Sequence, residues 1–295
     1  MHKLFIIKNI VWGFFLTRKI QEKKAIFCSS GLGDTFYTLL FIDEYVVKNK
    51  EENITVFISD KQKDIVEICK PQYITVKLYK GEYKPAFHYF LTLANRVNGN
   101  YRFLNLEPAI LGKKLKKYIE KHNFEQVFYY DLLKLKGDMP FKLIPDDEVW
   151  QENKVLIIPD SNSIITFSAE FWCNLINTLR DRFNFSVYVN KSTNQIINQE
   201  KEIYCYEKSV LDLYREAGTF RFIISIRNGI CDIVAKQRCR LIVLYPGEYS
   251  DPKKLKMYSL KDIKRSCEVK EIVIKDEKRN LSQEEIVNSC QLMLR

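Results

Sequence analysis

The chain has 295 residues, of which 46% are hydrophobic and 28% charged, and this composition excludes a disordered or low-complexity protein. Its formal net charge of +10 indicates an acidic partner, such as a phosphorylated small molecule, an anionic membrane surface or nucleic acid. The basic clusters lack the aromatic interleaving typical of RNA-binding modules, so we expect no nucleic-acid partner. A chain of this length predicts two domains of roughly 150 residues each.

The N-terminal segment 4–16 is largely apolar, but Lys8 and Asn9 interrupt it and it is too short to span a bilayer. Its basic start is similar to a signal sequence, yet Thr17-Arg18-Lys19 stands where a small-residue cleavage site is needed. We therefore predict a cytoplasmic protein. Two interpretations of the segment stay open. It either lies in an anionic membrane interface, which places the protein peripherally on the cytoplasmic face of the inner membrane, or packs on the first domain.

The cysteines and acidic residues carry no metal-binding pattern. The eight cysteines are scattered, with no C-x-x-C pair, which disfavours zinc and disulfide frameworks and favours a reducing compartment. The chain contains no Asp-x-Asp. We predict neither a metal nor another cofactor.

Alternating strands and helices are predicted along the whole chain. Short runs rich in β-branched and aromatic residues predict buried parallel strands at 25–28, 54–58, 74–78, 103–106 and 126–130, with helices near 35–48, 61–69, 87–97 and 108–121 between them. The periodicity fades from 132 to 153. It then resumes with strands at 155–158, 186–189, 203–206, 222–226, 241–244 and 271–274, and with helices at 169–182, near 193, at 210–217, from 229 and from 282. The pattern predicts an α/β fold of two Rossmann-like, doubly wound domains, 1–140 and 141–295, facing a cleft.

A glycine-containing turn joins the first predicted strand to the first predicted helix, and it reads Ser30-Gly31-Leu32-Gly33-Asp34. Glycine lets the backbone approach a ligand closely, and the start of a helix favours an anion. The dinucleotide fingerprint is incomplete because a third glycine is missing. Asp34 has two interpretations, a helix cap or a general base that faces the cleft.

A second polar turn, Arg227-Asn228-Gly229, follows the predicted strand 222–226 and opens a helix with Asp232 in its first turn. Arg227 can pair with a phosphate through two N–H groups, and the backbone N–H groups of the turn can add to this site. Asp232 either belongs to the site, or simply interacts favourably with the helix dipole or neutralises Arg227.

Weaker candidates stand after two further strands of the second domain. Ser161 and Asn162 are candidates for contacts with donor phosphates, and Tyr245 and Pro246 for contacts with a nucleotide base. An ordinary loop and ordinary packing explain the same residues. The three histidines, His2, His88 and His122, lie in no recognisable turn, so we predict no histidine-based chemistry.

Taken in order, the Gly-Asp turn, the segment 155–161, the turn 225–235 and the strand ending in Tyr-Pro resemble the two-domain GT-B glycosyltransferases. The likeness is greatest to the heptosyltransferase-like group, glycosyltransferase family nine. It implies that Asp34 is the catalytic base, that Ser30, Gly31 and Gly33 form an acceptor-side turn, and that the second domain binds a nucleotide-sugar. It further implies transfer to a glycan or glycolipid acceptor in bacterial lipopolysaccharide or capsule biosynthesis, with inversion and without a metal.

Two departures from the family pattern leave the donor open. Ile164-Ile165-Thr166 stand where the family usually has a lysine, and Arg227-Asn228-Gly229 where it usually has Asp-Thr-Gly. Two alternative functions also remain: a sugar-nucleotide epimerase of the same fold, which the scarcity of histidine disfavours, and a non-catalytic basic scaffold that binds membrane or nucleic acid.

Overall fold

The computed structural model of the protein describes residues 2–22, 24–29, 31–97, 102–140, 153–162, 164–199, 202–263, 265, 267–276 and 280–294. The chain divides into two compact units, Met1–Pro140 (unit 1) and Phe141–Arg295 (unit 2). Each unit is built on one parallel sheet with helices on both faces. The predicted α/β class with two Rossmann-like domains is confirmed.

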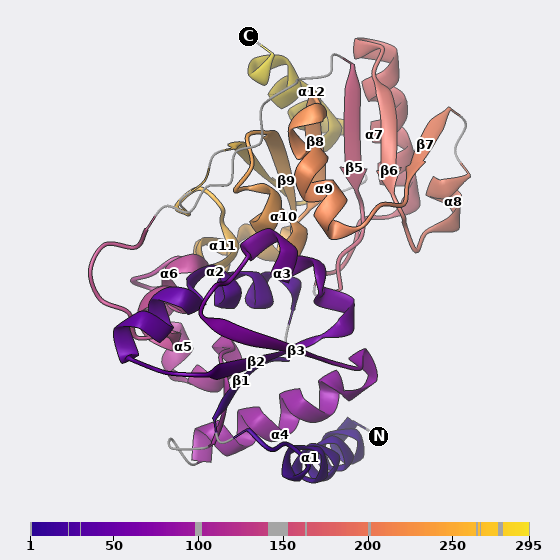
Figure 1. The fold of residues 1–295 in the computed structure, drawn as a ribbon. Helices are drawn as coiled ribbons and strands as arrows, with labels where there is room; N and C mark the ends of the chain where they lie inside the picture. Colours follow the sequence, from indigo (N-terminus) through magenta and orange to yellow (C-terminus); the bar gives the residue numbers. More distant parts are fainter. Residues whose placement is uncertain are drawn as a thin grey trace. The chain divides into compact units, whose positions relative to one another are not determined.

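Unit 1 has a four-stranded sheet in the order β3-β2-β1-β4, in which every pair is parallel. Helices α1 and α4 lie on one face of this sheet, and α2 and α3 lie on the other (Figure 1). Its strands are β1 (Ala25–Cys28), β2 (Ile54–Ser59), β3 (Ile74–Tyr79) and β4 (Phe103–Asn105). Its helices are α1 (His2–Arg18), α2 (Leu32–Asn49), α3 (Asp64–Cys69), α4 (Lys84–Val97), α5 (Lys114–Ile119) and α6 (Phe124–Gln126), with short turns η1 (Asp60–Gln62), η2 (Gly81–Tyr83) and η3 (Pro108–Leu111).

Stacked aromatic rings form the core on the α4 face of this sheet. Phe27 of the central strand β1 stacks on Phe57 with ring centroids 4.6 Å apart, and it contacts Phe87 and Phe103 at 4.9 and 5.6 Å. All four side chains are buried. Burial of one such ring stabilises the fold by about 1.5–3 kcal/mol, so β1 is fixed firmly at the centre of the unit.

The strand predicted at 126–130 is wrong, because this segment is helical. Helix α6 continues into a wide π-helical turn, η4 (Val127–Leu132). Asn123 begins it: its side chain accepts a hydrogen bond from the backbone N–H of Gln126 at 2.8 Å, and the Gln126 side chain accepts one from the backbone N–H of Asn123 at 3.0 Å. The aromatic residues that indicated a strand pack on α2 instead, with Phe128 and Tyr129 against Tyr37 and Phe41.

Unit 2 has a six-stranded parallel sheet in the order β10-β9-β8-β5-β6-β7. Numbered within the unit this order is 6-5-4-1-2-3, the doubly wound arrangement. The strands are β5 (Lys154–Ile158), β6 (Ser186–Asn190), β7 (Ile203–Tyr206), β8 (Phe222–Ile226), β9 (Arg240–Pro246) and β10 (Glu268–Ile274). The helices are α7 (Ala169–Phe183), α8 (Gln195–Asn198), α9 (Val210–Glu216), α10 (Gly229–Val234), α11 (Pro252–Tyr258) and α12 (Asn280–Met293), with turns η5 (Ala217–Thr219) and η6 (Gly247–Ser250).

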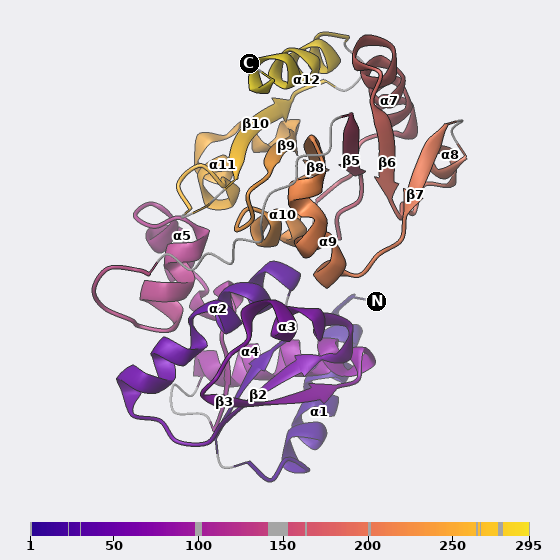
Figure 2. The same cartoon turned by 45° about the horizontal axis from the view of Figure 1, so that its top comes forward.

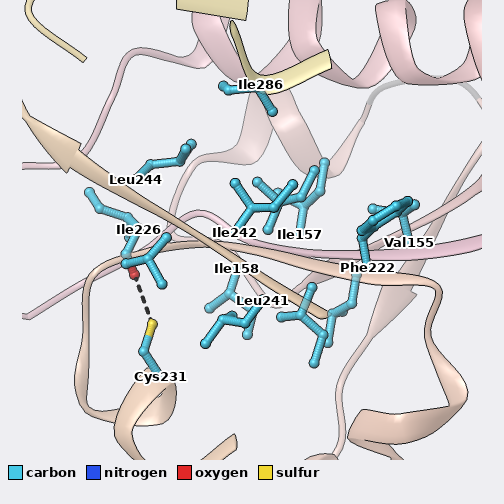
Figure 3. Close-up of a cluster of buried hydrophobic side chains, with 14 of the residues drawn as sticks. Val155, Ile157, Ile158, Phe222, Ile226, Cys231, Leu241, Ile242, Leu244 and Ile286 are labelled. Carbon is cyan, nitrogen blue, oxygen red and sulfur yellow. Dashed lines mark hydrogen bonds between the residues drawn. The ribbon is translucent and has the colours of Figure 1, made fainter. Parts of the chain in front are cut away.

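The core of unit 2 lies on both faces of this sheet. Helices α7 and α12 lie side by side, as do α9 and α10 (Figure 2). Ile286 of α12 covers one face of the central strands, and Cys231 of α10 lies beneath the other, with its thiol 3.6 Å from the carbonyl oxygen of Ile226 (Figure 3). The central strands are therefore apolar on both sides, which explains their continuous hydrophobic sequence.

Each sheet has one switch point, where the direction of winding reverses. In unit 1 it lies between β1 and β4, and in unit 2 between β5 and β8. Open α/β sheets bind their ligands outside the carboxyl ends of the strands at such a point. We therefore expect ligands to bind at two sheet edges, one at the switch point of each unit.

Candidate functional site

A network of buried polar side chains connects the ends of β1 and β4 at the switch point of unit 1. Ser29 follows β1 and Glu107 follows β4, and they are 2% and 1% exposed. The Ser29 hydroxyl donates to one Glu107 carboxylate oxygen at 2.6 Å, and Nδ1 of His88 lies 2.7 Å from the other. A buried carboxylate is costly unless it is paired and hydrogen-bonded, and both oxygens of Glu107 are. We call Ser29, Lys84, His88 and Glu107 the unit 1 cluster.

The two bases of this cluster stand one turn apart on α4. The hydrogen bond to Glu107 raises the pKa of His88, against an opposing effect of partial burial. Partial burial lowers the pKa of Lys84, while the carboxylates of Glu107 and Asp34 oppose that change. Because the charge of Asp34 also acts on the pKa of His88, Asp34 belongs to the same electrostatic neighbourhood.

The His88 ring is partly exposed on the side away from Glu107. Within the described part of unit 1, no protein group hydrogen-bonds to Nε2, and 31% of the side chain is exposed. An imidazole whose Nδ1 is held by a carboxylate can transfer a proton or bind a polar ligand through Nε2. His88 lies within α4 and in no turn, and the expectation of no histidine-based chemistry stays a prediction.

Asp34 lies in the first turn of α2, which begins at Leu32 rather than near residue 35. It is half-buried, and its Oδ2 accepts a hydrogen bond from the backbone N–H of Gly31 at 3.0 Å. This is the geometry of the helix-cap interpretation. Gly31 is exposed and Gly33 is buried in the same turn, whereas Ser30 lies outside the described residues. The role of Asp34 as a base stays a prediction.

In unit 2, the side chain of Asn228 connects the two loops at the switch point. Its Nδ2 donates to the carbonyl oxygen of Asp160, just after β5, at 3.0 Å. Its Oδ1 accepts from the backbone N–H groups of Ile230 and Cys231 at 2.9 and 3.3 Å, and so caps α10. One side chain thus holds together the two loops that follow β5 and β8.

Arg227 and Asp232 form a buried ion pair beside this loop. Their side chains are 5% and 3% exposed, and the two terminal guanidinium nitrogens donate to the two carboxylate oxygens at 2.8 and 2.7 Å. The guanidinium also donates to the carbonyl oxygens of Tyr258 and Asn228. Burial alone lowers the pKa of Arg227, but the carboxylate of Asp232 outweighs it and raises that pKa. The bidentate contact with a phosphate that the sequence predicts is not open in this arrangement, because Asp232 occupies it.

The weaker candidates of unit 2 divide into two kinds. Ser161 is half-buried and Asn162 exposed in the loop after β5, next to the switch point. Tyr245 and Pro246 lie inside β9 rather than after it. The Tyr245 ring is fully buried, and its hydroxyl oxygen is 2.6 Å from Glu271 and 3.0 Å from the carbonyl oxygen of Tyr258. Packing, not an exposed nucleotide contact, explains Tyr245.

The described residues contain no group of three or more His, Cys, Asp or Glu side chains arranged to hold a metal ion. Among the helices that the structure describes, none has the length and apolarity needed to cross a membrane. The expectation that the protein needs no cofactor stays a prediction.

Two doubly wound parallel-sheet units in one chain define the GT-B fold of glycosyltransferases, and this is the class to which the fold belongs. Among solved structures the chain is similar to a glycosyl transferase family 9 protein from Veillonella parvula, with 13% identity over 93% of this chain and 98% of that one and a TM-score of 0.59. The ADP-heptose lipopolysaccharide heptosyltransferase II of E. coli is 11% identical over 92% of this chain and 98% of that one, with a TM-score of 0.57. The E. coli heptosyltransferase WaaC, solved with ADP, is 13% identical over 91% of this chain and 99% of that one, with a TM-score of 0.55.

At these identities the likeness establishes the fold, and the predicted resemblance to heptosyltransferase-like proteins is confirmed at that level. No protein-family model matches the sequence, and no curated protein matches it either.

Proposed function

We propose that this protein is a glycosyltransferase that moves a sugar from a nucleotide-sugar to a glycan or lipid-linked acceptor in bacterial lipopolysaccharide or capsule biosynthesis. The observation that carries the proposal is the pairing of this fold, shared along nearly the whole chain with heptosyltransferases, with a polar network at each switch point. A glycosyltransferase of this kind binds a donor on one domain and an acceptor on the other. The chain has one switch point with a polar network on each unit, where these two ligands can bind.

In the proposed reaction Asp34 takes the proton from an acceptor hydroxyl on unit 1. The acceptor oxygen then forms a bond to the anomeric carbon of the sugar, while the bond from that carbon to the nucleotide diphosphate breaks. The diphosphate leaves with the electron pair, and a single displacement inverts the anomeric centre. His88, oriented by Glu107, positions the acceptor through Nε2.

The donor is proposed to bind at the switch point of unit 2, with Ser161 and Asn162 on one loop and Asn228 and Gly229 on the other. The neighbouring structures support a nucleotide-sugar, since one of them holds ADP and another is named for ADP-heptose. The sugar and nucleotide are left open because the turn 227–229 departs from the usual family sequence.

We further propose that transfer needs no metal ion. Unchanged transfer in the presence of EDTA would support this metal independence, and a loss of transfer that a divalent cation restores would contradict it.

Thermal stabilisation tests the donor directly. Nucleotide-sugars that carry ADP, UDP, GDP and CMP are added singly to the purified protein, together with the free nucleotides. A ligand that binds only the folded chain raises its melting temperature by mass action, without any acceptor. We expect at least one nucleotide-sugar to do so. A panel with no stabilising member contradicts the proposal.

The substitution Asp34→Asn separates the two interpretations of this residue. Asparagine keeps an oxygen that can accept the Gly31 N–H, so the helix cap survives while the base is lost. We expect the transfer rate to fall at least about 100-fold, with the affinity for the nucleotide-sugar nearly unchanged. Glu67→Gln, at an exposed acidic residue of α3, is the matched control. An unaltered rate in Asp34→Asn assigns Asp34 to capping alone.

The pair of His88 and Glu107 favours one second candidate, a sugar-nucleotide epimerase, because it supplies the histidine and carboxylate that such an enzyme uses. Incubation of each stabilising nucleotide-sugar in D2O without acceptor distinguishes the two. An epimerase incorporates deuterium into the sugar, whereas the transferase leaves the sugar unlabelled.

A further inference from the structure

Helix α1 packs on unit 1 through a side that carries small and polar residues beside apolar ones. Its residues Asn9, Gly13 and Thr17 are buried and four apart, so they form one stripe along the helix, and α1 packs on α4. A Cβ atom on Gly13 would lie 2.3 Å from the carbonyl oxygen of Ala86, so the two helices approach closely at this glycine. Ile10 and Leu16 flank this stripe and pack, partly buried, against the hydrophobic core of unit 1. This side therefore accounts for the attachment of α1 to unit 1, as the buried stripe of a surface helix normally does.

The opposite side of α1 is apolar and exposed. Leu4, Ile7, Val11 and Phe15 are 72%, 57%, 50% and 55% exposed, and their spacing of three and four residues places them on one side of the helix. At about 100° per residue this side lies across the helix from the buried stripe. We call these four residues the outer face of α1.

Positive charge borders the outer face. Lys3, Lys8 and Arg18 are exposed, and α1 contains no aspartate or glutamate. Trp12 and Phe14, each 38% exposed, stand at its two borders, where their rings also contact Tyr83 and Phe90 of unit 1. Apolar side chains flanked by lysine and arginine, with aromatic rings at the border, are the composition of helices that lie in the interface of an anionic bilayer.

We propose that the outer face of α1 docks on the surface of an anionic lipid bilayer, with the helix lying along the membrane. The charge pattern selects lipid over a second copy of this chain, because two α1 helices would bring their unopposed positive charges together. In this proposal both interpretations of segment 4–16 hold: one side of the helix packs on unit 1, and the other side binds the membrane.

Vesicle flotation with the full chain tests this proposal without any measurement of activity. The probes are vesicles of phosphatidylcholine alone and vesicles with about 30% phosphatidylglycerol, whose negative surface attracts basic segments. We expect binding to the anionic vesicles, weakened by salt. The double substitution Ile7→Gln/Val11→Gln should lower the bound fraction at least about 10-fold, because it places two polar groups in the contact. Lys3→Gln/Lys8→Gln should remove most of the preference for anionic vesicles.

The matched control is Ile196→Gln/Leu292→Gln, which changes two unit 2 side chains that are 64% and 62% exposed. We expect this variant to bind vesicles as the unaltered chain does. A blue shift of Trp12 fluorescence on vesicle addition, absent in Trp12→Phe, gives a second readout. Equal vesicle binding by Ile7→Gln/Val11→Gln and the unaltered chain overturns the proposal. A dimer in light scattering that disappears in that variant also overturns it and assigns the outer face to self-association.

Discussion

At the scale of single residues, the buried pair of Arg227 and Asp232 predicts a large effect on stability. Removal of one partner from a buried ion pair leaves an uncompensated charge, which costs about 3–5 kcal/mol. We expect Asp232→Asn to lower the free energy of unfolding by that amount in urea denaturation. Arg227→Met/Asp232→Leu, which removes both charges, should recover most of the loss. Asp181→Asn, at an exposed site on α7, serves as the control and should change stability by less than about 0.5 kcal/mol. A small effect of Asp232→Asn would contradict this prediction.

The hydrogen bond between His88 and Glu107 predicts a pH-dependent contribution to stability. Because the bond raises the pKa of His88 in the folded chain, protonation of His88 favours folding. The contribution is fully present below the unfolded pKa of about 6.5 and is lost as the pH rises through the higher folded pKa. We expect the stability difference between the unaltered chain and His88→Gln to be larger at about pH 6 than at about pH 8.5. In an NMR titration, Glu107→Gln should bring the pKa of His88 back down. A stability difference that is constant with pH would contradict the assignment.

At the scale of the secondary-structure elements, the close contact of α1 with α4 predicts an unusual sign for a glycine substitution. Gly→Ala inside a helix usually stabilises it by about 1 kcal/mol. At Gly13 the new methyl group would lie 2.3 Å from the Ala86 carbonyl oxygen and 2.5 Å from Cβ of Phe90, so α1 must move away. We expect Gly13→Ala to lower stability, by about 1–3 kcal/mol if α1 stays packed, or to speed hydrogen exchange of α1 amides if it separates. Val11→Ala, on the exposed side of the same helix, should show neither effect.

The elements that the sequence predicts correctly are those whose pattern is set by burial on the sheet. Strands such as β5 and β8 are apolar on both faces, and their runs stand out in the sequence. Segment 126–130 has the same aromatic and β-branched composition, yet it packs on one face of α2 as a helix. Composition alone does not separate these two cases. The reciprocal hydrogen bonds of Asn123 and Gln126 do, and the spacing Asn-x-x-Gln was visible in the sequence.

The two candidate sites also differ in how much of their contacts the sequence can predict. Asp232 lies five residues from Arg227, so the sequence could offer their pairing as an interpretation. Glu107 lies 78 residues from Ser29 and 19 from His88, and only the folded sheet brings them together. An acidic residue just after the strand 103–106 was the one local signal of this cluster. His88, in the middle of a helix, had none.

At the scale of the whole molecule, the proposed function assigns the donor to unit 2 and the acceptor to unit 1. Hydrogen exchange with and without ADP tests that division in the full chain. The loops after β5 and β8, near 159–162 and 227–231, stand at the switch point of unit 2. A nucleotide bound there should slow exchange of their exposed amides, because binding stabilises the local closed state. Amides at 31–34 and around Glu107 should exchange unchanged.

The same experiment on Asp34→Asn supplies the control. If Asp34 acts on the acceptor, the variant should show the same protection of unit 2 by ADP as the unaltered chain. Protection that appears at 31–34 instead would reverse the assignment and make the Gly31 turn the phosphate site. Such a result would leave Asp34 beside the nucleotide, where its negative charge repels a diphosphate, and would remove the argument for this residue as the base.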